Sequence, residues 1–256
     1  MALKSDFRFY YGWLVWLTLT GCASTKTSPS LANLPPSSVV TVQYYPRFLK
    51  GYEDSYPLRP IMVLRPVDDR EFPQRWSKDH QPSNGYPAVG VIMDAKQQVI
   101  ERLYAQPFVD LVQKALAQAA AEAGMTTVMS NQTSYGSALT SSPPAYVLAS
   151  RITRCWVERK LDVSDGGLGV WRSWAEFDLE ATLYKVPFRV PFWQAKSISV
   201  FYDPPPNTFD PGLASETALY ESPNEVLSVA LTKAVAGIFN HYDLRSLVTQ
   251  DRVLTQ

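Results

Sequence analysis

Alternating apolar and polar side chains mark the middle of the chain. Over residues 168–185, one set of alternate positions is apolar or small, and the other set is largely charged or polar. Such a period of two predicts a strand with one face against a core and the other toward solvent. Residues 146–163 are rich in β-branched and other apolar types and predict a partner strand.

The turn between these two runs sets their expected pairing. Asp165-Gly166 is a strong signal for a two-residue type I′ turn. Pairing through that turn predicts these cross-strand neighbours: Arg151 with Glu180, Ile152 with Leu179, and Leu148 with Leu183.

Two other segments have the apolar period of an amphipathic helix. In residues 108–123 apolar side chains recur at spacings of three and four, and Gly124 stands where a helix commonly ends. The second helix is expected to begin at Ser222, with Glu225 placed for a capping box, and its apolar stripe extends to Phe239. Shorter apolar runs predict further strands at 61–67, 89–93, 98–103, 126–129 and 192–202.

These elements together predict one α+β domain over about residues 39–246. Its two helices are expected to pack on one face of a mainly antiparallel sheet. Residues 247–256 are expected to form a C-terminal tail.

Residues 1–21 are typical of an export signal. An uncharged run, residues 9–20, is shorter than the roughly 20 residues that span a bilayer. Leu19-Thr-Gly-Cys22 follows and resembles the bacterial lipobox, in which an aliphatic residue and two small residues precede the cysteine. The resemblance implies cleavage before Cys22 and lipid on its thiol. Since Ala23 rather than Asp comes next, it also implies the outer membrane of a Gram-negative envelope, facing the periplasm.

Residues 22–38 are then expected to form a lipidated flexible tether, because they are small, polar and rich in proline. A plain secretory signal, or an uncleaved membrane anchor, is the alternative interpretation of this N-terminus.

Composition narrows the classes of function. The chain has 24 basic and 24 acidic residues without a basic run, which argues against nucleic-acid binding. Two cysteines and two histidines leave little for a disulfide scaffold, a zinc site or a catalytic triad. No nucleophile-elbow or phosphate-loop motif is present. We therefore expect a protein that is not an enzyme and binds no cofactor or metal.

Three groups of residues remain as candidate chemistry. Asp68 and Asp69 could hold a cation or act as acid and base, but a strand end with a turn aspartate paired with Arg70 is the simpler interpretation. Cys155 is expected to pack as a small strand residue. A candidate partner surface consists of Trp174, Glu176 and Asp178, because a tryptophan on the polar face of a strand is suited to contact a protein or lipid. A merely solvated sheet face is the alternative.

Several short motifs point to a family resemblance. They are Pro66-Val-Asp-Asp-Arg70, Val89-Gly90, the Ala-rich helix ending at Gly124, and the run 146–154. Their order behind a lipobox resembles two groups of bacterial lipoproteins, the YajG-like group and the auxiliary lipoproteins of ABC-type lipid transport systems. The chain departs from both groups in its loops at 70–87 and 203–211. The resemblance implies an accessory role in the envelope and carries over no catalytic residue.

Sequence thus predicts a membrane-anchored accessory or docking subunit of an envelope transport or assembly system, with an envelope protein as partner. A periplasm-facing carrier of a lipid or other apolar ligand is the alternative.

Overall fold

The computed structural model describes residues 39–46, 58–70, 86–137, 144–163, 169–188, 190–202 and 222–253. Cys22, the expected signal peptide and the expected tether lie outside the described residues, as do the Asp165-Gly166 turn and the loops 71–85 and 203–211.

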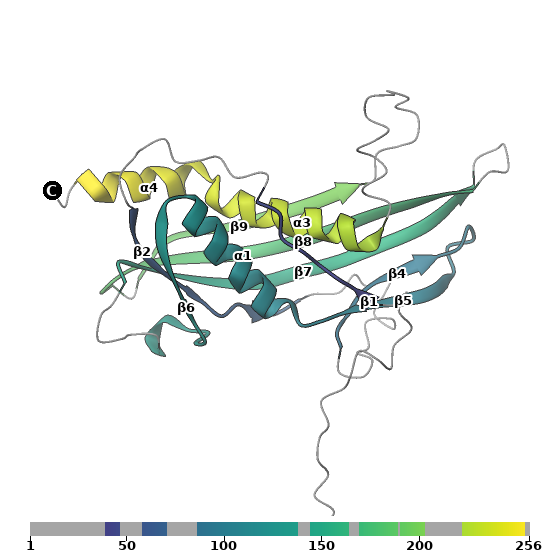
Figure 1. Cartoon of the computed structure of the whole chain (residues 1–256), viewed down its shortest axis with the longest axis horizontal. Coiled ribbons are helices and arrows are strands. Elements are labelled where there is room, and N and C mark those ends of the chain that lie inside the picture. Colours follow the sequence, from purple (N-terminus) through teal and green to yellow (C-terminus); the bar gives the residue numbers. More distant parts are fainter. Residues whose placement is uncertain are drawn as a thin grey trace, which may run out of the picture.

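The described strands form one nine-stranded sheet around two long central strands (Figure 1). β7 (Tyr146–Val163) and β8 (Gly169–Lys185) pair antiparallel, and β9 (Pro191–Tyr202) pairs antiparallel with β8. The other edge of β7 takes three strands in succession, all parallel to it: β2 (Leu58–Leu64), β3 (Val67–Asp68) and β4 (Ala88–Met93). The outermost strands are β6 (Met125–Ser130) beside β2, and β5 (Val99–Ala105) followed by β1 (Val39–Val40) beside β4.

The sheet is mixed, so the expectation of a mainly antiparallel sheet is only partly right. Among the described strands, five pairings are parallel and three are antiparallel. The antiparallel pairings join strands that are neighbours in the sequence, where turn signals are readable. Parallel pairings need crossover connections between distant segments, and such connections leave no local signal in the sequence.

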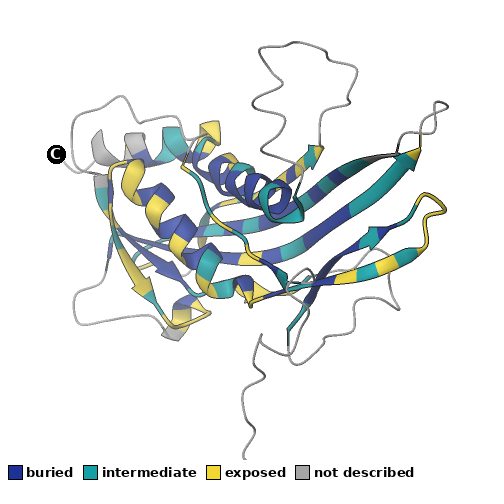
Figure 2. Cartoon of the chain, turned by 45° about the vertical axis from the view of Figure 1, so that its right-hand side comes forward, coloured by how far each residue is buried: buried dark blue, intermediate teal, exposed yellow. Residues whose placement is uncertain are grey.

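Helices α1 (Phe108–Glu122) and α3 (Pro223–Phe239) lie together on one face of the sheet (Figure 1). We call this the inner face. The expected caps are present: the Ser222 hydroxyl accepts a hydrogen bond from the Glu225 amide, and Gly124 has a φ of 91°. Figure 2 shows that α3 is buried on nearly all sides. Apart from a polar row that includes Asn224, Ser228 and Thr232, its surface is largely apolar, which suits such a central position.

A third helix, α4 (Tyr242–Val253), was not predicted. Its Leu244 and Val248 are 2% and 3% exposed and belong to the main core. The domain boundary expected at residue 246 is therefore wrong, because it falls inside a packed helix. Residues 242–253 have low overall hydrophobicity, so the sequence gives little indication that this helix packs against the core.

An extended segment after β1 runs along α3 and is fixed to it by three hydrogen bonds. The amides of Thr41, Gln43 and Tyr45 donate to side-chain oxygens of Asn224, Ser228 and Thr232 at 3.1, 2.9 and 3.0 Å. Alternate residues of an extended chain and every fourth residue of a helix advance by similar distances, about 6 to 7 Å. The spacing of the backbone donors therefore matches the spacing of the side-chain acceptors on α3. We call residues 41–45 the strap.

A one-residue irregularity in β7 decides which of its side chains face the helices. The three cross-strand pairs predicted from the turn are present, but only on the far side of this irregularity from the turn. Next to the turn the predicted register is wrong by one residue, because Val163 pairs with Gly169 whereas a two-residue turn would pair it with Leu168. Beyond Ile152 the register shifts by one residue, so that Arg154 pairs with Asp178 and Trp156 with Glu176. Because one extra residue reverses the faces of a strand, Trp156 moves to the outer face, away from the helices.

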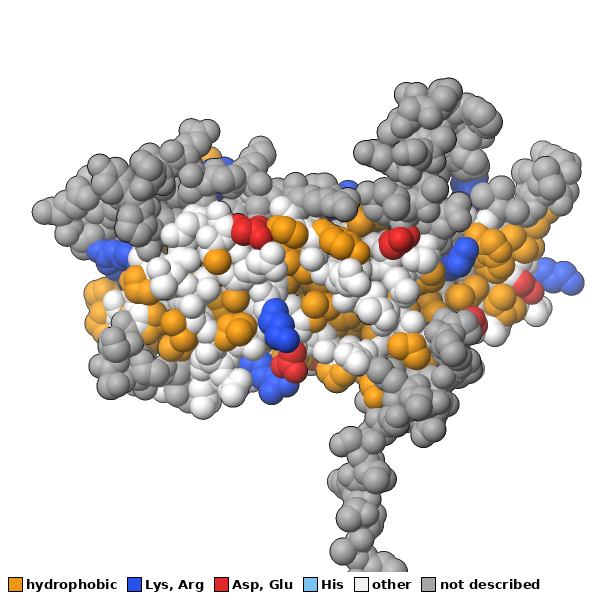
Figure 3. Space-filling model, viewed as in Figure 1, with side chains coloured by type: hydrophobic (Ala, Val, Ile, Leu, Met, Phe, Trp, Pro, Cys, Tyr) orange, Lys and Arg blue, Asp and Glu red, His pale blue; other side chains and the backbone are white. Residues whose placement is uncertain are grey.

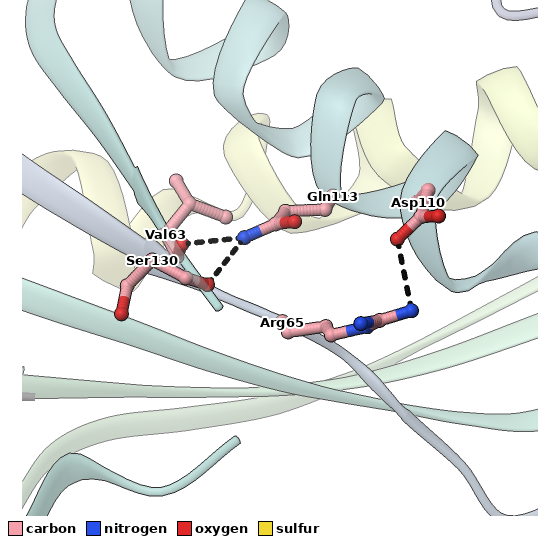
Figure 4. Close-up of polar contacts among 5 residues, drawn as sticks. All are labelled: Val63, Arg65, Asp110, Gln113 and Ser130. Carbon is pink, nitrogen blue, oxygen red and sulfur yellow. Dashed lines mark hydrogen bonds and ion pairs between the residues drawn. The ribbon is translucent and has the colours of Figure 1, made fainter. Parts of the chain in front are cut away.

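Helix α1 is joined to the sheet by a buried amide. Gln113 is 7% exposed, and its Nε2 donates to the carbonyl oxygens of Val63 at 3.1 Å and Ser130 at 2.7 Å (Figure 4). One side chain thereby satisfies carbonyls from β2 and β6 together. On the same side, Arg65 and Asp110 form an ion pair at 3.1 Å.

Candidate functional site

The outer face of β8 carries the three residues of the candidate partner surface. Trp174, Glu176 and Asp178 do point away from the helices, as the alternation predicts, because Ala175, Phe177 and Leu179 belong to the core beneath the helices. Trp174 is half-buried, however, and the other two are largely shielded from solvent. Asp178 is 3% exposed, and the side chain of Glu176 is 15% exposed.

Trp174 is held by a carboxylate on the neighbouring strand. Its Nε1 donates to Glu158 Oε2 at 3.1 Å, and the Nε1 of Trp156 donates to Glu158 Oε1 at the same distance. Glu158 is 2% exposed and Trp156 is fully buried. The two indoles thus hold both oxygens of one buried carboxylate. Sequence reasoning missed this cluster because the one-residue shift in β7 brings Trp156 and Glu158 to the outer face.

The other two residues are tied by ion pairs to flanking strands. Glu176 accepts from Arg154 on β7 at 2.8 Å, and Asp178 lies 3.4 Å from the Lys196 ammonium on β9. Burial raises the pKa of Asp178, and the charge of Glu176 adds to the rise, while Lys196 and Arg154 oppose it. These ion pairs hold the outward-pointing side chains of β8 in place against the neighbouring strands β7 and β9.

The accessible part of this face lies one strand further out. Ile198, Val200 and Tyr202 on β9 are 64%, 37% and 67% exposed. Tyr202 stacks on Trp174 with ring centroids 6.2 Å apart. The alternation of residues 192–202 predicts that these three side chains lie on one face of the strand. It does not predict which face of the strand the helices cover.

A shallow hollow of about 390 Å³ opens between β7, β8 and β9 on the same face. We call it the outer-face groove, and its polar lining includes Arg151, Glu180, Thr182, Gln194 and Lys196. Arg151 and Glu180 are register partners as predicted, but Arg151 makes its ion pair with Asp69.

A larger groove of about 620 Å³ lies on the helix side, beside the start of α1. Its walls combine apolar residues such as Val42, Phe108 and Leu111 with the charged residues Arg65 and Lys114. Figure 3 shows this side of the molecule, with apolar side chains gathered toward the end where the β4–β5 and β7–β8 hairpins project.

The remaining candidates have structural roles. Arg70 binds Asp68 through Nε at 2.7 Å and Nη2 at 3.0 Å, which confirms the simpler interpretation of that aspartate. The Arg70 guanidinium also lies 5.4 Å from the centre of the Phe108 ring. Cys155 is 2% exposed in the main core, and burial raises its pKa to about 12, so the thiol is protected from reaction as expected.

The described residues contain neither a candidate metal cluster nor a membrane-spanning helix. No group of three or more histidine, cysteine or acidic side chains is arranged to hold a metal ion within the described ranges. In the same part of the chain, no helix has the length and apolar character needed to cross a membrane.

Comparison with known proteins gives distant structural likenesses. No family model and no curated protein match this chain. A Xanthomonas campestris protein described as DUF330 is 12% identical with a TM-score of 0.44, over 84% of this chain and 98% of that one. A Helicobacter pylori neuraminyllactose-binding hemagglutinin homolog is 11% identical with a TM-score of 0.43, over 84% and 100%. A hypothetical Chlamydia trachomatis protein is 10% identical with a TM-score of 0.34, over 75% and 99%. Likenesses this distant do not bear on function.

Proposed function

We propose that this protein is a lipoprotein of a Gram-negative envelope, anchored by lipid on Cys22 at the periplasmic face of the outer membrane. It acts without catalysis, as an accessory or docking subunit of a transport or assembly system. The observation that carries the proposal is the sequence Leu19-Thr-Gly-Cys22 behind an uncharged run, followed by a tether-like stretch. Several acyl chains, each methylene adding about 0.8 kcal/mol, would hold the domain at the membrane.

A docking role is supported by the outer face of the sheet. Its charges are fixed by neighbouring strands: Glu176 binds Arg154, and Asp178 lies beside Lys196. A surface ordered before binding loses little conformational entropy when a partner arrives. The outer-face groove lies within this ordered region and offers the partner both charged and small side chains.

The alternative is a carrier of an apolar ligand, for which the layer between the sheet and the helices is the simplest place to bind it. That layer is filled by side chains such as Leu116, Ile152 and Leu231, all fully buried in the main core. The groove beside α1 is the feature that favours a carrier, because its volume is in the range of ligand sites. A ligand there would lie outside the core, against α1.

Site-specific photocrosslinking in living cells tests the docking role. A photoreactive residue replacing Thr182 in the outer-face groove should give one discrete adduct with an envelope protein. The same residue replacing Gln118, which is exposed on α1 and lines neither groove, is the matched control and should not give that adduct. Equal adducts at both positions, or none at Thr182, would contradict docking through this face. A lipid retained through purification and displaced by Leu111→Trp would favour the carrier.

A further inference from the structure

The groove beside the start of α1 is closed toward the core and open along its walls. Three of its lining residues, Val40, Ala105 and Phe108, are only 3%, 1% and 1% exposed, so a ligand cannot pass between them into the core. Val42 and Leu111 also line the groove but are half-buried, so part of each side chain is accessible. The volume of about 620 Å³ lies within the range of about 300–1,000 Å³ that small-molecule sites have. The groove therefore suits a ligand that lies along α1.

Within the described lining of this groove, one cation has no counter-ion. Arg65 is neutralised by Asp110, whose Oδ1 lies 3.1 Å from Arg65 Nη2 (Figure 4). Lys114 lies one helical turn beyond Asp110, and it makes no ion pair or hydrogen bond with any described residue. The described lining thus carries two cations and one anion, a net charge of +1. Charge complementarity favours a ligand with one negative group.

The unpaired cation lies beside accessible apolar surface. Leu111 and Lys114 are three positions apart on α1, so their side chains are neighbours on one face of the helix. Val42 of the strap supplies further apolar surface to the same groove. A purely polar anion would bind weakly here, because an exposed ion pair contributes little by itself. An anion with an attached hydrocarbon chain would use Lys114 and the apolar walls together.

We propose that the groove beside α1 binds an anionic amphiphile, a molecule with one carboxylate or phosphate head and a hydrocarbon chain. The head pairs with Lys114, and the chain covers Leu111 and Val42. Burial of the chain supplies most of the affinity, while the head decides which amphiphile is preferred. The inference rests on the carrier alternative, which it deepens by naming the class of ligand. It does not involve the outer-face groove, so docking there is decided separately by the Thr182 crosslink.

Photolabelling of the full chain in lipid nanodiscs tests the preference for an anionic head. Two probes carry the same photoreactive decyl chain, one ending in a carboxylate and the other in a trimethylammonium group. Relative to the wild type, Lys114→Glu should lower labelling of residues 105–114 by the anionic probe about fivefold, the change that an exposed ion pair supports. The same variant should raise labelling by the cationic probe. Comparing variants with one probe at a time cancels the partition of that probe into the bilayer.

Three further measurements serve as controls. Lys96→Glu makes the same change of charge at an exposed position between β4 and β5 that lines neither groove, so it should be labelled like the wild type. Leu111→Trp, which narrows the groove, should reduce labelling by both probes. Unlabelled decanoate and decyl phosphate, added as competitors, distinguish a carboxylate head from a phosphate head.

Two results would overturn the proposal in different ways. Labelling of Lys114→Glu equal to that of the wild type with both probes would refute the anionic head and leave a carrier of uncharged ligands untouched. Labelling of residues 105–114 no stronger than that of residues 115–122 would refute the groove as a binding site, and the carrier with it. Failure of both decanoate and decyl phosphate to compete would equally contradict an anionic ligand.

Discussion

At the scale of single residues, the outer face is held together by groups that are costly to disturb. The alternation of β8 predicts correctly which side chains point outward. It does not predict their burial or their partners on the flanking strands, Glu158 for Trp174, Arg154 for Glu176 and Lys196 for Asp178. Outward-pointing and exposed are therefore different properties in this sheet.

Trp174→Phe should destabilise the protein by about 1–3 kcal/mol, because one oxygen of the buried Glu158 carboxylate loses its indole donor. Tyr202→Phe retains the ring that stacks on Trp174 and is the matched control, with an expected change within about 0.5 kcal/mol. Urea unfolding measures both variants. Equal stabilities for the two would show that the Glu158 hydrogen bond is unimportant.

Asp178 should give the protein a recognisable dependence on pH. Its pKa is raised in the folded state above the ordinary value of 3.8, so ionisation is harder in the folded chain than in the unfolded chain. Stability is therefore lost as pH rises from that value through the raised one. Asp178→Asn removes this loss, and unfolding curves from pH 3 to 7 should show the variant gaining on the wild type as pH rises. A constant difference would contradict the raised pKa.

At the scale of elements, α1, α3 and most of the strands followed from local signals, and the remaining elements did not. Strands β4 and β5, the caps of α1 and α3, and three register pairs of β7 and β8 are close to the predictions. The strap, α4 and the parallel pairings depend on contacts between segments far apart in the sequence. The bulge after Ile152 is likewise invisible, since no glycine or proline marks it.

The hydroxyl groups that hold the strap each accept one hydrogen bond and donate another. Thr232 Oγ1 accepts from the Tyr45 amide and donates to the Ser228 carbonyl. Thr232→Val keeps the shape but removes both bonds, and it should destabilise the fold by about 1–3 kcal/mol. Asn224→Ala removes a strap bond that is exposed to water and should have a smaller effect. Thermal unfolding ranks the two, and the reverse order would contradict this view of the strap.

Close approach of β4 to β7 depends on a glycine. A Cβ on Gly90 would lie 2.0 Å from the Val157 carbonyl oxygen, a backbone atom that cannot rotate away. Gly90→Ala should therefore destabilise the fold by about 3 kcal/mol. Gly136→Ala is the control, because nothing lies within 4 Å of its added Cβ. Denaturant midpoints decide the point, and a Gly90→Ala variant as stable as the control would disprove the clash.

At the scale of the whole molecule, a sheet with an ordered outer face is combined with a proposed lipid anchor. The candidate site could be located from sequence only as a face of a strand. Its accessible part, on β9, depends on which side α3 covers. The lipid anchor, by contrast, is predicted from sequence alone. Its signal is local to Leu19–Cys22, which lies outside the described residues.

Attachment of lipid to Cys22 is the central claim, and metabolic labelling with a palmitate analogue tests it most directly. The wild-type chain and Cys155→Ala should take up label and fractionate with the outer membrane, since Cys155 is buried in the core. Cys22→Ala should lose both the label and the processed N-terminus. If Cys22→Ala is still labelled and still fractionates with the membrane, the chain is not anchored through this cysteine and the account is wrong.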